Sequence, residues 1–335
     1  MSLTPGELQV VAESDQNQLD TQSGKEPSIV GRSLYAIAWR RLRKDKVAMV
    51  AGIIIVLIVL IAIFADQLGS LYGTSYLTQH NTGSGSLLDP LTSMPLGSLG
   101  GVSAKHWFGV TPVLGQDILT LLMQGARTSL LIGSLATVVS LVFGVSLGLI
   151  AGYYRGFADV VISRIMDVLL SFPTLLLSIS LITVIALISS SEVLRAGVII
   201  FVLGFFGWPY IGRIVRGQVL SLREKEFVDA AKSLGASNGW IMAREIAPNL
   251  IGPILVYTTL TIPNNMLGEA GLSFLGVGVQ PPTTSWGQML SDAGNYYQID
   301  PMYLILPGVA IFISVMAFNL FGDGLRDALD PRRMN

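Results

Sequence analysis

The chain has 335 residues, of which 51% are hydrophobic and only 13% are charged, whereas a soluble domain carries roughly a quarter charged residues. This deficit of charge indicates a protein whose surface faces lipid rather than water. The formal net charge of −1 gives no basic surface for nucleic acid. The absence of cysteine excludes disulfides, thiolate metal sites and a cysteine nucleophile.

The amino-terminal region, residues 1–46, is expected to be a cytoplasmic tail that ends in an interfacial helix. Its polar, mildly acidic start lacks the charged-then-apolar pattern of a cleavable signal peptide. In Ser33–Lys46, the side chains of Leu34, Ala38 and Leu42 share one helical face among arginines, which is typical of a helix lying on a membrane surface. An equally good interpretation is a plain basic flank that orients the first span.

Six apolar runs are each long enough to cross a bilayer as a helix. The first, Val47–Ala65, has 19 residues without a charge. At about 1.5 Å per residue it covers about 28 Å of a hydrocarbon core that is roughly 30 Å thick. Several later runs contain proline, which spanning helices tolerate because neighbouring groups satisfy the freed carbonyls. The other predicted spans are Thr128–Gly152, Ile165–Ile188, Ala196–Val215, Leu250–Leu272 and Met302–Phe321.

The basic residues indicate the orientation of these spans. Six spans put both termini on one side of the membrane, and 18 of the 21 lysines and arginines fall on that side. The three exceptions are Lys105, Arg127 and Arg195. Because cytoplasmic loops carry the excess of Lys and Arg, both termini are expected to be cytoplasmic. The remaining segments are then an external insertion at 66–127, a five-helix core at 128–321 and a cytoplasmic tail at 322–335.

The second predicted span carries glycines at every fourth position, at Gly144, Gly148 and Gly152. Small residues at this spacing let two helix backbones approach closely. We therefore expect this face to pack against a neighbouring helix rather than to contact a substrate.

The loop 224–249, on the cytoplasmic side between the fourth and fifth spans, has the most informative pattern. Gly235 stands where a left-handed residue ends a helix. Ser237 or Asn238 is placed to cap a second short helix, and Pro248 marks the turn into the next span. The pattern predicts a helix–turn–helix elbow whose apolar stripe inserts into a groove on another protein. At helical spacing the stripe comprises Phe227, Ala230, Ala231 and Leu234.

At these residues the sequence resembles permease subunits of ABC importers. Asp229-Ala-Ala231, with Gly235 after three further residues and then Pro248, is similar to the EAA loop of that family. The external insertion and the charged amino-terminal helix are similar to the C-type permease of the branch that serves dipeptides, oligopeptides and nickel. Other stretches similar to that branch are Gly115–Asp117, Gly125–Arg127, Asp167–Pro173, Arg216–Glu224, Glu269–Gly276, Gln280–Pro282, Ser285–Gly287 and Gly322–Pro331.

The resemblance implies an all-α membrane protein with six transmembrane helices, the type I ABC importer permease fold and a cytoplasmic coupling helix. It also implies a place in the bacterial inner membrane beside a second, B-type permease, two cytoplasmic ATPase subunits and an extracytoplasmic substrate-binding protein. The residues implied to dock on the ATPase are Phe227, Asp229, Ala230, Ala231, Leu234, Gly235, Ser237 and Pro248. Motion of the ATPase subunits would then swing the spans between inward-open and outward-open states.

Three departures from the family pattern affect the detailed docking contacts but not the identity of the loop. Asp229 stands where the family usually has glutamate, which keeps the charge and shortens the side chain by one methylene. Glu245 and Ala247 replace bulkier apolar residues before the proline, and Gln116 stands where the branch often has arginine.

The chain itself is not expected to be an enzyme or to bind a cofactor. It contains no Gly-x-x-x-x-Gly-Lys-Ser/Thr sequence to hold nucleotide phosphates, so ATP and Mg²⁺ are expected on the ATPase partners. His80 and His106 are its only histidines, and they lack the short spacing of metal ligands. No serine–histidine–acid or paired-carboxylate pattern is placed for catalysis.

Two groups of residues are candidates for contact with cargo or its carrier. Glu269 is an ionisable group within a span, which marks either a pathway or gate residue or a hydrogen bond between packed helices. Asn264 and Asn265 on the same span have the same two interpretations. In the external loop near 280–301, either contact with the binding protein or an aromatic belt at the membrane surface explains Trp286, Tyr296 and Tyr297.

Two rival functions were weighed. A self-contained secondary transporter predicts internally repeated halves and ion-coupling charges at the midplane, and neither stands out in the sequence. A membrane scaffold leaves the pattern of the 224–249 loop unexplained. Among cargoes, peptides lead, followed by nickel chelates and short sugars, since relatives vary cargo through the external binding protein.

Overall fold

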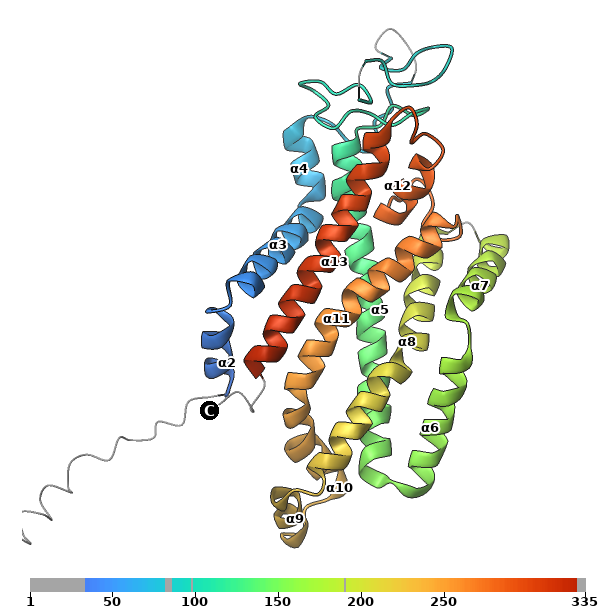
Figure 1. Cartoon of the computed structure of the whole chain (residues 1–335). Helices are drawn as coiled ribbons and strands as arrows, with labels where there is room; N and C mark the ends of the chain where they lie inside the picture. The colour runs from blue at the N-terminus through green and yellow to red at the C-terminus, as the bar shows by residue number, and fades with distance from the viewer. Residues whose placement is uncertain (1–33, 82–85, 98, 190, 330–335) are drawn as a thin grey trace, which may run out of the picture.

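The computed structural model describes residues 34–81, 86–97, 99–189 and 191–329, and this part of the chain is built from helices. Its β structure among these residues is limited to two isolated bridges, Leu88–Pro95 and Val110–Asp117, in the external segment. In chain order the helices are α2 (Leu34–Leu42), α3 (Lys46–Ile63), α4 (Ala65–Tyr72), α5 (Ile118–Tyr154), α6 (Gly156–Ser171), α7 (Thr174–Ile188), α8 (Glu192–Leu222), α9 (Glu226–Ser233), α10 (Asn238–Trp240), the π-helix η1 (Ile241–Ile246), α11 (Ala247–Phe274), α12 (Trp286–Ala293) and α13 (Pro301–Leu329). Figure 1 shows long helices side by side, with loops at one end and α9 at the other.

Among the described residues, five helical stretches are long and apolar enough to cross a membrane, and a sixth crossing exists if α6 and α7 count as one bent span. The prolines at Pro209, Pro253, Pro263 and Pro307 lie inside continuous helices, as expected. The expected span Ile165–Ile188, however, is not one helix, because α6 and α7 meet at an angle of 79°.

The break between α6 and α7 lies at Phe172 and Pro173. Phe172 has an extended backbone with ψ 134°. A proline disfavours the helical conformation in the residue before it and has no backbone N–H to continue the helix. The Phe-Pro pair therefore converts one apolar run into two short helices.

Helix α5 begins ten residues earlier than the apolar run that predicted it, at Ile118 rather than Thr128. The carboxylate of Asp117 caps this end by accepting a hydrogen bond from the backbone N–H of Thr120 at 2.9 Å. The same carboxylate lies 2.9 Å from Nδ1 of buried His106. Residues 118–127, expected in the external insertion, are therefore the outer end of α5.

The glycines of α5 let it pack closely against α8, which confirms the expected role. A Cβ on Gly148 would lie 2.6 Å from the carbonyl oxygen of Gly212. One on Gly152 would lie 2.7 Å from Cβ of Val219, and one on Gly144 would lie 2.9 Å from Cβ of Ile211. These distances are shorter than real Cβ contacts, so larger residues would force the two helices apart.

The corner between α2 and α3 is fixed against the end of α13. Ala38 and Leu42 of α2 are buried with Ala48 of α3 and Ala328 of α13. Asp45 caps α3 by accepting hydrogen bonds from the backbone N–H groups of residues 47 and 48. The described part of the predicted amphipathic helix thus exists, and its apolar face packs on the protein's own α13.

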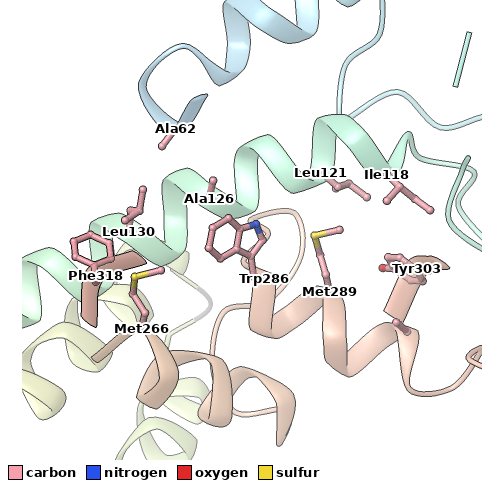
Figure 2. Close-up of a cluster of buried hydrophobic side chains, with 11 residues drawn as sticks. Ala62, Ile118, Leu121, Ala126, Leu130, Met266, Trp286, Met289, Tyr303 and Phe318 are labelled. Atoms are coloured by element: carbon pink, nitrogen blue, oxygen red, sulfur yellow. The ribbon is translucent and has the colours of Figure 1, made fainter. Parts of the chain in front are cut away.

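The largest buried cluster lies at the outer half of the bundle, around α5. Figure 2 shows side chains from α3, α5, α11, α12 and α13 meeting there, with the indole of Trp286 directed toward α5. The buried members are Ala62, Ile118, Leu121, Ala126, Leu130, Met266, Trp286, Met289, Ala293, Tyr303 and Phe318. The short external helix α12 is therefore held by the same core as the spans.

Candidate functional site

The segment that connects α8 with α11 forms the predicted elbow. Its first helix, α9, has an inward face on which Val228 is fully buried and Ala231 is 8% exposed. These two side chains pack in a cluster with residues of α8, η1 and the start of α11. The outward face carries Phe227, Ala230 and Leu234, and Leu234 is 88% exposed. Three of the four predicted stripe residues thus face outward, while Ala231 faces inward.

Gly235 ends α9 in the left-handed conformation, with φ +81°, which confirms the prediction. The N–H of Ala236 donates to the carbonyl of Ala231, and the N–H of Gly235 donates to the carbonyl of Lys232. These two hydrogen bonds form a Schellman cap, which satisfies the carbonyls at the end of a helix. Asp229 is exposed on the first turns of α9 and pairs with Lys232 at 3.0 Å.

The second arm of the elbow begins at Ser237, whose hydroxyl accepts a hydrogen bond from the N–H of Trp240 and so caps α10 as predicted. The arm then continues through the π-helix η1 into α11, so that Pro248 does not mark a turn. The N–H of Ala247 donates to the carbonyl of Met242, five residues back. This wider hydrogen-bonding pattern precedes the proline, and π-helical turns of this kind interrupt α-helices without ending them.

The base of the elbow is tied to the inner end of α5. The hydroxyl of Tyr153 donates to Oδ1 of Asn238 at 2.9 Å. The guanidinium of Arg223 donates to the backbone carbonyl of Tyr153, and Arg155 pairs with Glu224. Neither Val228 nor Tyr153 was singled out from the sequence. The only available signal was the spacing of Val228 and Ala231, three apart on α9.

In Figure 1, α9 extends beyond the ends of the long helices, opposite the loops that join α4 to α5. An exposed apolar face, a capped helix and a base anchored to two spans make a rigid projection. Packed elements of this kind move as bodies rather than deforming continuously.

Glu269 lies in the packing between helices and is fully buried. Its carboxylate accepts hydrogen bonds from the hydroxyls of Ser129 on α5 at 3.0 Å and Ser273 on α11 at 2.7 Å. Ser285, before α12, is a third hydroxyl partner. Of the two interpretations of this residue, the contacts favour a hydrogen bond between packed helices over an open pathway position.

Each of these three serine hydroxyls also accepts a backbone N–H. The N–H of Trp286 donates to Ser129, that of Val279 to Ser273 and that of Gln288 to Ser285. Each hydroxyl proton is therefore free to point at the carboxylate, whose oxygens accept hydrogen bonds. One buried side chain thereby fastens the external loop between α11 and α12 to α5.

The two asparagines near Glu269 differ in their surroundings. The side-chain amide of buried Asn265 donates to Oγ1 of Thr137 on α5 at 3.0 Å, so it also joins two helices. Asn264 is exposed and donates to the carbonyl of Leu260 in its own helix. Of the three candidate pathway residues, only Asn264 lies on a surface where another molecule has access.

The three aromatic candidates of the external loop do not form one surface. Trp286 is 3% exposed, and its indole N–H donates to the carbonyl of Leu122 at 3.0 Å (Figure 2). It is therefore part of the core and is not placed to contact a binding protein. Tyr297 is 51% exposed and Tyr296 is partly exposed, so these two remain accessible.

Histidine and carboxylate side chains in the described part of the chain form no group of three or more that could hold a metal ion. The closest association is at the outer end of α5, where the hydroxyl of Tyr72 lies 3.4 Å from the carboxylate of Asp117 beside His106. Burial raises the pKa of Tyr72 above its usual value. Because Asp117 caps α5, this cluster has a structural role.

The arrangement of the helices is that of an ABC importer permease. A chain of the MetNI methionine ABC transporter, solved in inward-facing conformations, superposes with a TM-score of 0.53 at 19% sequence identity, covering 64% of this chain and 98% of that one. At this identity the likeness concerns the fold alone.

The family is shown by sequence. Residues 144–335 match the family described as binding-protein-dependent transport system inner membrane component, and residues 33–90 match the N-terminal transmembrane domain of oligopeptide transport permease C. The chain belongs to this family and is a multi-pass permease subunit of an ABC importer. Such subunits are not catalytic, since ATP is hydrolysed by partner ATPase subunits, and a binding protein delivers the cargo. Family membership excludes the secondary-transporter interpretation.

Similar proteins include dipeptide and glutathione permeases. The dipeptide transport system permease protein DppC of Alkalihalophilus pseudofirmus is 43% identical over 295 residues, covering 88% of this chain and 89% of that protein. The glutathione transport system permease protein GsiD is 39% identical over 294 residues in Pectobacterium atrosepticum and 38% identical over 296 residues in Escherichia coli. These matches cover 88% of this chain and 90% and 89% of the two relatives.

Proposed function

We propose that this chain is one of two different permease subunits in an importer of short peptides, and that α9 is the helix through which ATPase motion reaches the spans. The observation that carries the proposal is the outward apolar face of α9 on an elbow anchored to α5 and α8. Helices with such a face bind in grooves of partner proteins. Two ATPase subunits bind ATP with Mg²⁺, while this chain contributes half of the pathway.

The basic residues support a cytoplasmic position for α9 and both termini. The cargo is inferred from the relatives, which are named for dipeptide and glutathione transport at 38% to 43% identity. A second permease is expected because a single set of about six spans is too small to enclose a path for a peptide. The resemblance to the C-type permease of a pair implies that it is a related but different chain.

The natural absence of cysteine allows a direct test of docking. Ala230→Cys on the outward face, modified with a short photoactivatable cross-linker that inserts into neighbouring bonds, should cross-link to an ATPase subunit in membranes. Leu91→Cys in the external segment, which is 94% exposed, is the matched control and should not cross-link to it. Cross-linking at both positions, or at neither, would refute the docking role of α9.

The cargo is tested by uptake of a labelled dipeptide into cells that carry the importer as their only peptide transporter. Uptake should require this chain and should be inhibited by unlabelled dipeptide. Full uptake without the chain, or inhibition by a nickel chelate or a short sugar but not by peptide, would exclude the peptide assignment.

A further inference from the structure

The corner between α2 and α3 carries an unusual density of positive charge. Five of the seven residues 40–46 are Lys or Arg. Four of these side chains are exposed and make no ion pair or hydrogen bond with any residue that the structure describes. They are Arg40, Arg43, Lys44 and Lys46. Asp45 lies among them, but its carboxylate is occupied in capping α3.

Several other cations at the same end of the bundle are neutralised by the protein itself. Arg216 pairs with Asp159 at 2.5 Å and Arg213 pairs with Asp167 at 2.5 Å, in both cases between α8 and α6. In addition, Arg155 pairs with Glu224. Arg40, Arg43, Lys44 and Lys46 differ from these cations because none of the four pairs with an acid in the part of the chain that the structure describes.

The corner also borders the most apolar candidate span, which is also the one least buried within this chain. Of the five candidate spans, α3 has the highest mean hydropathy, 3.0, and the smallest buried share, 17% against 22% to 44% for the others. Val47 and Val50, which follow the basic run directly, are each 57% exposed. Lysine and arginine beside such a surface extend their stems along it and place their charges at the level of lipid headgroups.

The exposed indole of Trp39 completes the corner. Trp39 is 57% exposed, whereas Ala38 and Leu42 of the same helix are buried and hold it on α13. Tryptophan with an apolar ring and a polar N–H favours the boundary between hydrocarbon and water. The corner is thus a fixed arrangement of an interfacial ring and four unpaired cations, next to a helix that faces acyl chains.

We propose that Arg40, Arg43, Lys44 and Lys46, together with Trp39, form a binding site for the headgroups of anionic phospholipids. Basic residues next to a spanning helix are attracted to anionic lipid headgroups, and the attraction falls off within a Debye length. Because α2 packs on α13, a headgroup bound here holds the first span and the last span in one register with the membrane surface. The site is independent of the cargo and of the docking role of α9.

The test uses the purified importer in lipid nanodiscs that contain both phosphatidylglycerol and phosphatidylcholine. Val47→Cys, 57% exposed directly after the basic run, is labelled with a fluorophore. Quenching is compared for phosphatidylglycerol and phosphatidylcholine that carry the same spin label. We expect the phosphatidylglycerol to quench about fivefold more efficiently, the factor that corresponds to about one favourable cation–headgroup contact. Leu71→Cys on α4, at the outer end and 84% exposed, is the control and should show no preference.

Charge variants then assign the preference to the corner. Arg40→Gln, Arg43→Gln, Lys44→Gln and Lys46→Gln combined should bring the quenching ratio close to one, whereas Arg40→Lys with Arg43→Lys should keep it. Because these charges also help to orient α3, the lipid preference of the protein that keeps all four charges is also measured at several salt concentrations. Its preference should fall as salt rises from about 0.05 to about 0.5 M, since screening shortens the reach of the cations.

Three results would overturn the proposal. The first is an equal response to both lipids in the protein with all four cations. The second is a preference that survives neutralisation of the four cations, or that soluble glycerol phosphate abolishes. The third is a label at position 47 that neither lipid quenches because an ATPase subunit covers it, which would make the corner a protein interface.

Discussion

Position 235 favours glycine because of its backbone conformation and not because neighbouring atoms crowd it. Its φ is +81°, and a Cβ placed there would have no heavy atom within 4 Å. A side chain at this position therefore costs only the strain of the left-handed conformation, about 1–2 kcal/mol for an ordinary residue and more for a β-branched one. We expect Gly235→Val to open the Schellman cap and to impair uptake while the protein is still inserted in the membrane.

The matched variant at this position is Gly235→Asn, since asparagine tolerates the left-handed region. It should retain most of the uptake. The measurements are labelled-dipeptide uptake and the amount of chain in the membrane. Normal uptake by Gly235→Val at normal abundance would show that the cap does not matter for coupling.

Glu269 joins three polypeptide segments through one carboxylate, so its removal should loosen the outer half of the bundle. Glu269→Ala leaves the hydroxyls of Ser129 and Ser273 without their buried acceptor, and each such loss costs about 1–3 kcal/mol. We expect a lower melting temperature of the purified protein for this variant. Ser129→Ala should have a smaller effect, because it removes only one of the donors. Equal melting of Glu269→Ala and the parent would contradict the network.

The roles of these residues could be predicted from the sequence only in part. The left-handed Gly235 and the Ser237 cap depend on neighbours within a few positions, and the sequence places both correctly. The partners of Glu269 could not be predicted in this way, because Ser129 lies 140 positions away in the sequence. For the same reason the sequence predicts Trp286 at a surface, because its burial depends on contacts with α5, which is far away in the chain.

At the scale of elements, α9 has two faces that predict opposite outcomes for the same chemical change. Val228 is fully buried, so Val228→Asp places an unpaired charge in the inner cluster and should cost more than about 3 kcal/mol of stability. Leu234 is 88% exposed, so Leu234→Asp should leave the fold intact and reduce association with the ATPase. Melting temperature and co-purification of ATPase separate the two effects. Loss of stability in both variants would show that the outward face is not a free surface.

The contact between α5 and α8 depends on glycine in the same position-specific way. Gly148→Leu would force its side chain into the carbonyl of Gly212, and overpacking of this kind costs about 1–3 kcal/mol. Gly217→Leu on α8 is the control, since a Cβ there meets nothing within 4 Å. We expect a lower melting temperature for the first variant only. Similar melting temperatures for the two variants would contradict close packing of α5 against α8 at Gly148.

Hydropathy predicted the existence of the spans better than their limits. Apolar runs mark where a helix is in lipid, but its ends depend on capping groups such as Asp117, which extends α5 to Ile118. Hydropathy does not predict the break at Pro173 either, because other prolines lie inside continuous helices of this chain. Each proline weakens the helix locally in the same way, and the packing around it decides whether the helix continues or is interrupted.

At the scale of the whole molecule, α5 lies between the two ends that function requires. Its outer end packs in the cluster around Trp286 and its inner end is tied to the elbow through Tyr153 (Figure 1). In the proposed coupling, a displacement of α9 would be carried to the external loops by a single 37-residue helix rather than by a chain of loops. The family assignment was within reach of sequence alone, whereas this mechanical continuity is visible only in the fold.

The orientation of the bundle gives the last prediction. The excess of Lys and Arg predicts a cytoplasmic position for the α9 end. Leu234→Cys should therefore be protected from a membrane-impermeant maleimide in intact cells. Leu91→Cys at the opposite end should react, because its position is 94% exposed. Permeabilising the cells and stripping off the ATPase subunits, which are proposed to cover this face, should expose position 234. The cysteine-free parent supplies the blank. Labelling of position 234 in intact cells would place α9 outside the cytoplasm, where no ATP-hydrolysing subunit could reach it, and would refute its coupling role.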